Sequence, residues 1–286
     1  MGTEFFADLI QFPFLQYALM AGLLSSIACG LIGSYITVKR ITYIAGAIAH
    51  CVLGGMGAAR YLHVTAGLTF LTPLHGALFA AILAAIIIGM VTMYSKQRMD
   101  TVLSAIWAIG MALGILFIYM TPGYAEDLMS YLFGNILMVN PRDLTLITIL
   151  DIVIICIMIV FYNKILALSF DAEYATIRGI PVHFYSFILL ILTALTIVTL
   201  IQVVGIVLVI ALLSLPAATA SNFSKQLWQM MGLSVILCVL YTAGGLFISY
   251  DTNLPSGATI ILLSGSVYLT TVVAKNIVRR VRKKVN

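Results

Sequence analysis

Long apolar stretches separated by short polar ones account for most of the chain. About 20 consecutive apolar residues are needed for a helix to cross the hydrocarbon core of a bilayer. By this measure the pattern predicts an all-α polytopic membrane protein, a single transmembrane domain over residues 1–286, with nine spans at 13–38, 41–62, 74–95, 101–121, 143–163, 183–202, 204–220, 228–249 and 257–275. The region 183–220 is almost continuously apolar, so its division around Gln202 and Gly205 is the weakest boundary and eight crossings remain possible.

One polar segment, residues 171–181, has the start and stop signals of a short helix. Asp171 can cap the first free N–H groups, and Glu173 sits where the helix dipole favours an anion. Gly179 can take the left-handed conformation that ends a helix, and Pro181 prevents its continuation. The segment therefore predicts a helix at about 171–179.

The apolar face of this predicted helix holds Tyr174 and Ile177 beside Ala175. A transporter that receives mechanical work from a soluble motor needs such a rigid handle. Amphipathic helices that only lie at the membrane interface have the same pattern, so both interpretations stay open at this point.

Composition supports the membrane assignment. Of the 286 residues 62% are hydrophobic and 9% are charged, and the mean hydropathy is +1.13, whereas soluble domains carry about 25% charged residues. The first 12 residues include Glu4 and Asp8 but no basic residue, so no cleavable signal peptide is expected before the first span.

Basic residues fall mostly on one side of the membrane if nine spans alternate. On that side lie Lys39, Arg40, Lys96, Arg98, Lys164, Arg178, Lys225 and the basic tail 275–286, whereas Arg60 and Arg142 fall opposite, with Glu126, Asp127 and Asp251. The positive-inside rule then predicts an external amino terminus, with the carboxyl terminus and the 171–179 helix in the cytoplasm. The net charge of +5 and the basic tail are typical of an orientation signal beside anionic lipid, and we expect no nucleic-acid partner.

The sequence lacks the common motifs for nucleotide binding, for serine hydrolase chemistry and for metal binding. The chain has no G-x-x-x-x-G-K-[ST] phosphate loop, no G-x-S-x-G elbow, and no C-x-x-C or H-E-x-x-H metal motif. Its four cysteines lie inside apolar spans without close spacing, which predicts no disulfide. Energy for transport must therefore come from another chain or from an ion gradient.

His50 is the first candidate for metal binding. It stands mid-span, one helical turn after Gly46 and one before Gly54, on a face almost bare of side chains, which predicts room for a solute beside the imidazole. Neutral imidazole is a good zinc ligand, but a buried polar group in a span can equally mark a satisfied helix contact. The glycines themselves are typical of close helix packing.

Asp151 is the second ionisable candidate inside a span. A carboxylate at the bilayer centre costs roughly 2.5 to 3.5 kcal/mol on insertion scales, so Asp151 must face protein or water or be protonated. A role in the transport path and a helix-to-helix hydrogen bond both remain open. His63, His75 and His183 lie near span ends, where solvated histidines are common.

Several blocks of the sequence follow one another in a familiar order nearly from end to end. These are residues 21–40, 44–50, 100–114, 130–134, 170–180, 204–217 and 254–257. With these blocks the chain as a whole resembles the permease subunits of bacterial ATP-binding cassette importers for zinc, manganese and iron.

The resemblance implies a multi-pass protein of the bacterial cell membrane that works as a homodimer. Two cytoplasmic ATPase subunits would hydrolyse ATP, and an extracytoplasmic metal-binding protein would deliver the ion. This chain would be non-catalytic and bind no cofactor, the metal ion being its cargo. The 171–179 segment becomes the coupling helix, in which Tyr174, Ile177 and Arg178 contact the ATPase, and His50 falls on the family's pathway histidine.

One departure from the family pattern concerns the metal. Manganese-type members commonly place an aspartate one turn before that histidine, where this chain has Gly46. Hard oxygen ligands suit Mn²⁺ and imidazole suits Zn²⁺, so the loss favours zinc, although iron remains possible. Two hypotheses compete with an ATP-driven importer. One is a secondary transporter driven by protons through Asp151 and His50, which would be expected to show an internal repeat that we do not find. The other is a membrane scaffold without transport.

Overall fold

The computed structural model describes residues 8–94, 98–122, 134, 136 and 139–285. In this part of the chain all regular structure is helical: α2 (Pro13–Val38), α3 (Thr42–Thr65), α4 (Pro73–Tyr94), α5 (Met99–Met120), α7 (Pro141–Phe170), α8 (Ala172–Ile177), α9 (Val182–Val204), α10 (Ile206–Ala220), α11 (Leu227–Thr252) and α12 (Ser256–Val285). Outside the described residues lie Glu4, Lys96, Glu126, Asp127 and residues 130–133 of one family block. The predicted all-α fold is confirmed.

Eight of the described helices are long and apolar enough to cross a membrane. The ninth predicted span is the shorter helix α10, whose 15 residues extend about 22 Å at 1.5 Å per residue, less than the roughly 30 Å of a hydrocarbon core. Gly205, at φ +78°, separates α9 from α10 at the predicted boundary. The described residues thus form eight full-length candidates for membrane spans and one shorter apolar helix of 10–17 residues.

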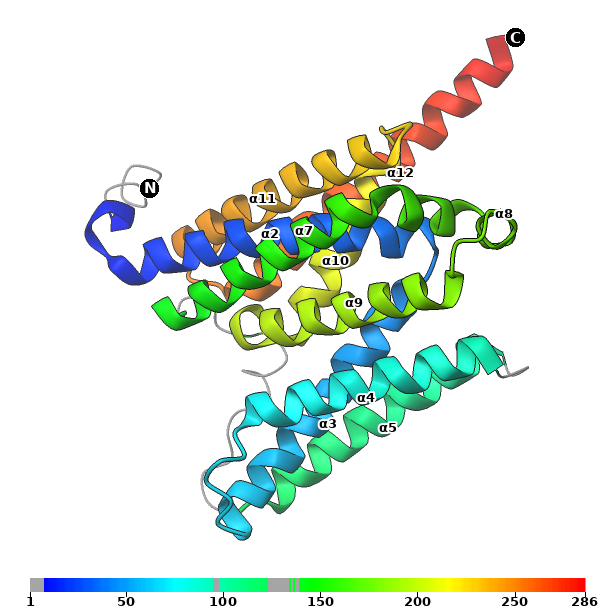
Figure 1. Ribbon diagram of the computed structural model, residues 1–286. Coiled ribbons are helices and arrows are strands. Elements are labelled where there is room, and N and C mark those ends of the chain that lie inside the picture. The colour runs from blue at the N-terminus through cyan, green and yellow to red at the C-terminus, as the bar shows by residue number, and fades with distance from the viewer. Residues whose placement is uncertain (1–7, 95–97, 123–133, 135, 137–138, 286) are drawn as a thin grey trace.

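The ends of the helices alternate as the spans predict. Lys275, in α12, donates from Nζ to the carbonyl oxygen of Asn222 at 3.2 Å, so α10 and α12 end on the same side. Figure 1 shows α8 and the carboxyl terminus at one end of the bundle and the amino terminus at the other. Which end faces the cytoplasm stays a prediction from the basic residues.

Two groups of helices build the bundle (Figure 1). Helix α2 packs against α11, α10 and α7, whereas α3, α4 and α5 pack together and join the rest mainly through α9, with smaller contacts from α3 to α10 and α2. Glycines allow the close approaches. A Cβ added to Gly33 would lie 2.2 Å from the carbonyl oxygen of Leu213 in α10, and one on Gly55 would lie 2.2 Å from that of Gly76 in α4. The interpretation of the small residues as packing sites is confirmed, since such backbone contact in lipid requires them.

Candidate functional site

Helices α3 and α5 run side by side and bring together the residues around His50. A Cβ on Gly54 would lie 2.8 Å from the carbonyl oxygen of Gly110, so the two backbones touch there. Nearer the start of both helices, the indole of Trp107 fills the space between them. It stacks on His50 with 4.5 Å between ring centroids and 23° between ring planes.

The His50 side chain is 7% exposed, and its Nδ1 atom is buried without a hydrogen-bond partner among the described residues. Leaving a buried polar atom unpaired costs about 1–3 kcal/mol. The interpretation of His50 as a satisfied helix contact therefore lacks support at Nδ1. An unpaired imidazole nitrogen in a span suits a group that pairs with a transient ligand.

The predicted room beside His50 is not there. Trp107 occupies it: a Cβ on Gly46 would lie 2.5 Å from Cζ3 of the indole. The physical reason is that a face without side chains lets a neighbouring helix press a large ring against it. Trp107, which the sequence alone did not single out, is thus the main neighbour of the candidate metal ligand, and its ring covers Gly46.

Asp151 does not join His50. It lies in α7 with 3% exposure, against α2 at Ala28 and Cys29. Neither carboxylate oxygen has a hydrogen-bond partner of standard geometry among the described residues, although the backbone of Ala28 in α2 lies beside the carboxylate. A role in the transport path and a helix-to-helix contact therefore both stay predictions. In the described part of the chain no group of three or more His, Cys, Asp and Glu side chains is arranged to hold a metal ion.

The other histidines lie at the surface. His63 and His183 are exposed, and Nδ1 of His75 lies 2.7 Å from the hydroxyl of Thr72. The cysteines are free thiols, distributed over α2, α3, α7 and α11. Neither set forms a cluster with His50.

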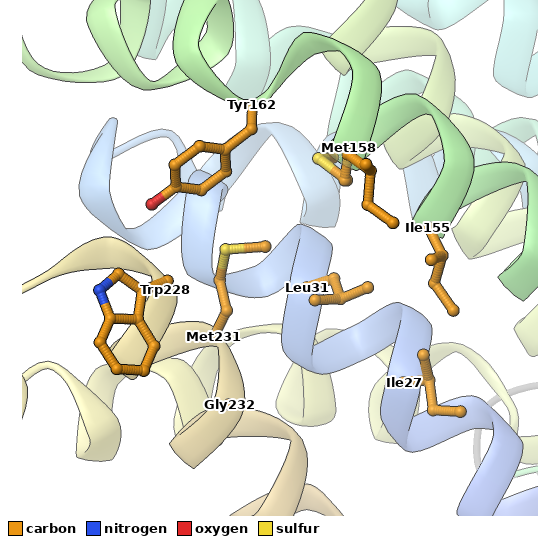
Figure 2. A pocket seen from close by; sticks show the side chains of 9 residues that line it. Ile27, Leu31, Ile155, Met158, Tyr162, Trp228, Met231 and Gly232 are labelled. Atoms are coloured by element: carbon orange, nitrogen blue, oxygen red, sulfur yellow. The ribbon is translucent and has the colours of Figure 1, made fainter.

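A cavity of about 610 Å³ opens between α2, α7 and α11 (Figure 2). Figure 2 shows Met158 and Tyr162 of α7 across from Met231 and Trp228 of α11, with Leu31 of α2 between them. The described residues that line it include no carboxylate and no imidazole. This apolar cavity therefore does not provide a cation site.

Helix α8 begins and ends with the predicted signals. The Asp171 carboxylate accepts a hydrogen bond from the backbone N–H of Tyr174 at 2.9 Å, which is the N-cap bond. At the other end Gly179 has φ +75°, and the N–H of Ile180 donates to the carbonyl of Ala175 at 3.0 Å. Both bonds stop the helix from fraying.

One side of α8 is free and the other is anchored. Ile177 is 85% exposed and Tyr174 is 48% exposed, whereas Ala175 is fully buried. The expectation that Ala175 belongs to the exposed face is wrong, because it lies about 100° around the helix from Tyr174. Arg178 donates from Nε to the Tyr174 hydroxyl at 2.9 Å, and Glu173 lies exposed in the first turn. The outer face is a defined surface of apolar and basic groups.

Known proteins resemble this chain over nearly its whole length. It is 42% identical over 266 residues to the uncharacterized membrane protein slr2045 of Synechocystis, covering 93% of this chain and 92% of that one. It is 34% identical to the manganese transport system membrane protein MntC of Halalkalibacterium halodurans, covering 93% and 89%. A solved structure of PsaBC from Streptococcus pneumoniae in complex with Fab superposes with a TM-score of 0.83 at 33% identity, covering 95% of each chain. The ABC 3 transport family model matches residues 11–275, and the chain belongs to this family.

Proposed function

We propose that the chain is the permease subunit of an ATP-driven importer of divalent transition-metal ions. Membership in the ABC 3 transport family supports transport, and the name of the relative MntC supports a metal ion as cargo. The sequence has no phosphate loop, so ATP hydrolysis belongs to a partner subunit and this chain is non-catalytic.

The observation that carries the ATP-driven mechanism is helix α8. Its caps make it rigid, Ala175 anchors it, and Tyr174, Ile177 and Arg178 are presented outward. A short amphipathic helix of this kind fits a groove on an ATPase subunit. Closure of the ATPase would then move α8, and with it α7 and α9, which α8 contacts.

The observation that supports His50 as the pathway residue is its buried Nδ1 atom, which has no hydrogen-bond partner among the residues that the structure describes. One imidazole cannot hold a metal ion by itself, because transition metals take four or more ligands. A homodimer would supply a second imidazole, and an extracytoplasmic metal-binding protein would supply the loaded ion. In this proposal the ion passes the two His50 side chains as the dimer alternates between outward and inward access.

Zinc is the metal that we propose first. Position 46 carries no carboxylate, and the Trp107 ring leaves no space for one, so the donor set at this level is imidazole, which suits Zn²⁺ better than Mn²⁺. MntC of Halalkalibacterium halodurans, which is named for manganese transport, is 34% identical to this chain. Manganese and iron are the alternative outcomes of the transport assay.

The test is reconstitution of the chain in vesicles together with the ATPase subunit encoded by a neighbouring gene. Uptake of zinc, manganese and iron is measured with ATP, with a non-hydrolysable analogue and with a proton gradient alone. We expect uptake with ATP only, and we expect His50→Ala to abolish it while the complex still assembles. Uptake on the gradient alone would refute the proposal and support the secondary transporter, for which the buried carboxylate of Asp151 would be the proton carrier.

A further inference from the structure

A second, smaller cavity lies between the first turns of α3 and α5. It measures about 330 Å³ and is lined by Tyr43 of α3 and by Asp100, Leu103, Ser104 and Trp107 of α5. Asp100, Ser104 and Trp107 follow one another at i, i+4 and i+7, so they share one face of α5. Unlike the apolar cavity of Figure 2, this one contains a carboxylate and a hydroxyl.

Trp107 is the wall between this cavity and His50. The ring lines the cavity, and it also stacks on the imidazole at 4.5 Å. An ion leaving His50 along the α3 and α5 interface toward the start of these helices would have to pass the indole first. The cavity is the next space on that route.

The cavity lies near the end of the bundle where we predict the cytoplasm. Both helices begin there, next to the basic residues Arg40 and Arg98. Figure 1 shows the first turns of α5 at the same end as α8. A cation in this cavity would therefore lie between His50 and the side to which an importer delivers its cargo.

Both oxygen donors of the cavity are accessible, because the side chains of Asp100 and Ser104 are exposed. Carboxylate and hydroxyl oxygens, completed by water, are ligands for a hydrated divalent cation. An acid in the first turn of a helix also stabilises the helix dipole, and the experiment below separates that role from cation binding.

We propose that this cavity is a release vestibule, in which Asp100 and Ser104 receive a hydrated divalent cation after it passes Trp107. That the ion arrives from His50 rests on the proposed function. That a cation binds at Asp100 does not rest on it. The two statements can therefore fail separately.

The chain contains two tryptophans, which makes Trp107 a convenient reporter. Trp228 lies in α11 and lines the other cavity, so Trp228→Phe leaves Trp107 as the single indole. Mn²⁺ is paramagnetic, prefers oxygen ligands and quenches indole fluorescence at short range. We expect saturable quenching when the purified full-length Trp228→Phe protein is titrated with MnCl₂ in detergent.

Variants on this background identify the site. Asp100→Asn should raise the Mn²⁺ concentration for half-maximal quenching by about tenfold or more, because it removes the charged oxygen ligand. Asp100→Glu keeps the carboxylate and should stay within about threefold of the parent. Asp251→Asn, at an exposed acid near the end of α11, is the matched control and should change nothing.

His50→Phe separates the vestibule from the pathway site, because it keeps a ring against Trp107 but removes both nitrogens. Saturable quenching that survives His50→Phe and is lost in Asp100→Asn supports the vestibule, even if ATP-dependent uptake fails. Quenching that is lost in His50→Phe but unchanged in Asp100→Asn would place the ion at His50 and overturn the vestibule. Quenching without saturation would overturn it as well.

Discussion

The contact between Gly46 and Trp107 predicts a measurable coupling between two substitutions. A Cβ at position 46 would lie 2.5 Å from Cζ3 of the indole and 3.1 and 3.2 Å from two further ring carbons. Carbon atoms pack best at about 3.5–4.0 Å, so the ring would have to retreat by about 1 Å. Such a shift would pull it away from His50, on which it stacks at 4.5 Å.

Overpacking of this kind costs about 1–3 kcal/mol. Gly46→Ala also gains about 1 kcal/mol of helix propensity, which partly hides the clash in the single variant. In a Trp107→Ala background the clash is absent and the propensity gain remains, so Gly46→Ala should become stabilising there. The propensity term appears in both backgrounds and cancels in the double-mutant cycle, which leaves a coupling energy of about 1–3 kcal/mol.

The assay is equilibrium unfolding of the four proteins in mixed micelles, with helicity as the signal and the free energy of unfolding as the result. A coupling below about 0.5 kcal/mol would be indistinguishable from additivity. It would refute the claim that the indole fills the space over Gly46. A coupling of the expected size would also explain why an acidic side chain cannot simply be placed at this position.

Two further predictions concern helix packing and coupling. Gly33→Ala should lower the free energy of unfolding by about 1–3 kcal/mol, because the new Cβ would meet the Leu213 carbonyl oxygen at 2.2 Å. Gly232→Ala is the control and should not lower it, because no atom lies within 4 Å of its new Cβ. Equal effects in unfolding experiments would count against the glycine contacts. Tyr174→Asp and Arg178→Glu should weaken binding of the ATPase subunit in a pull-down assay. Arg280→Glu, which changes an exposed residue of the basic tail, is the control and should bind normally. Normal binding by both α8 variants would contradict the role of α8.

Much of the fold could be predicted because its signals are local. The length of an apolar run is set by the bilayer, so the spans agree with the long helices to within a few residues at most ends. The end of α9 was also visible, since Gly205 takes a positive φ that other residues avoid. The sequence did not show that α10 is too short to cross the membrane. The apolar run after Gly205 is continuous with the one before it, so its composition does not fix the length of the second helix.

The candidate site was predicted less well, because its contacts join distant segments. The sequence shows Gly46, His50 and Gly54 on one helical face, but it does not show what lies against that face. The bare face suggested an open space, and the structure fills it with Trp107 from another helix. Asp151 was similarly ambiguous, since only the structure shows that it faces α2 and not α3.

The α3 and α5 interface orders its polar groups in a way that suits release of a cation. The deepest is the buried imidazole of His50, whose Nδ1 has no hydrogen-bond partner in the described part of the chain. The outermost are the oxygens of Asp100 and Ser104. An ion that has lost water to reach an imidazole regains oxygen ligands only where carboxylate, hydroxyl and water are available. A carboxylate at the mouth stabilises the ion before full hydration, and the intervening indole of Trp107 keeps the two environments apart. Gly46 provides no carboxylate beside His50, whereas Asp100 provides one beyond Trp107. In our proposal the ion therefore meets oxygen ligands when it leaves the path and not at the deepest point of it.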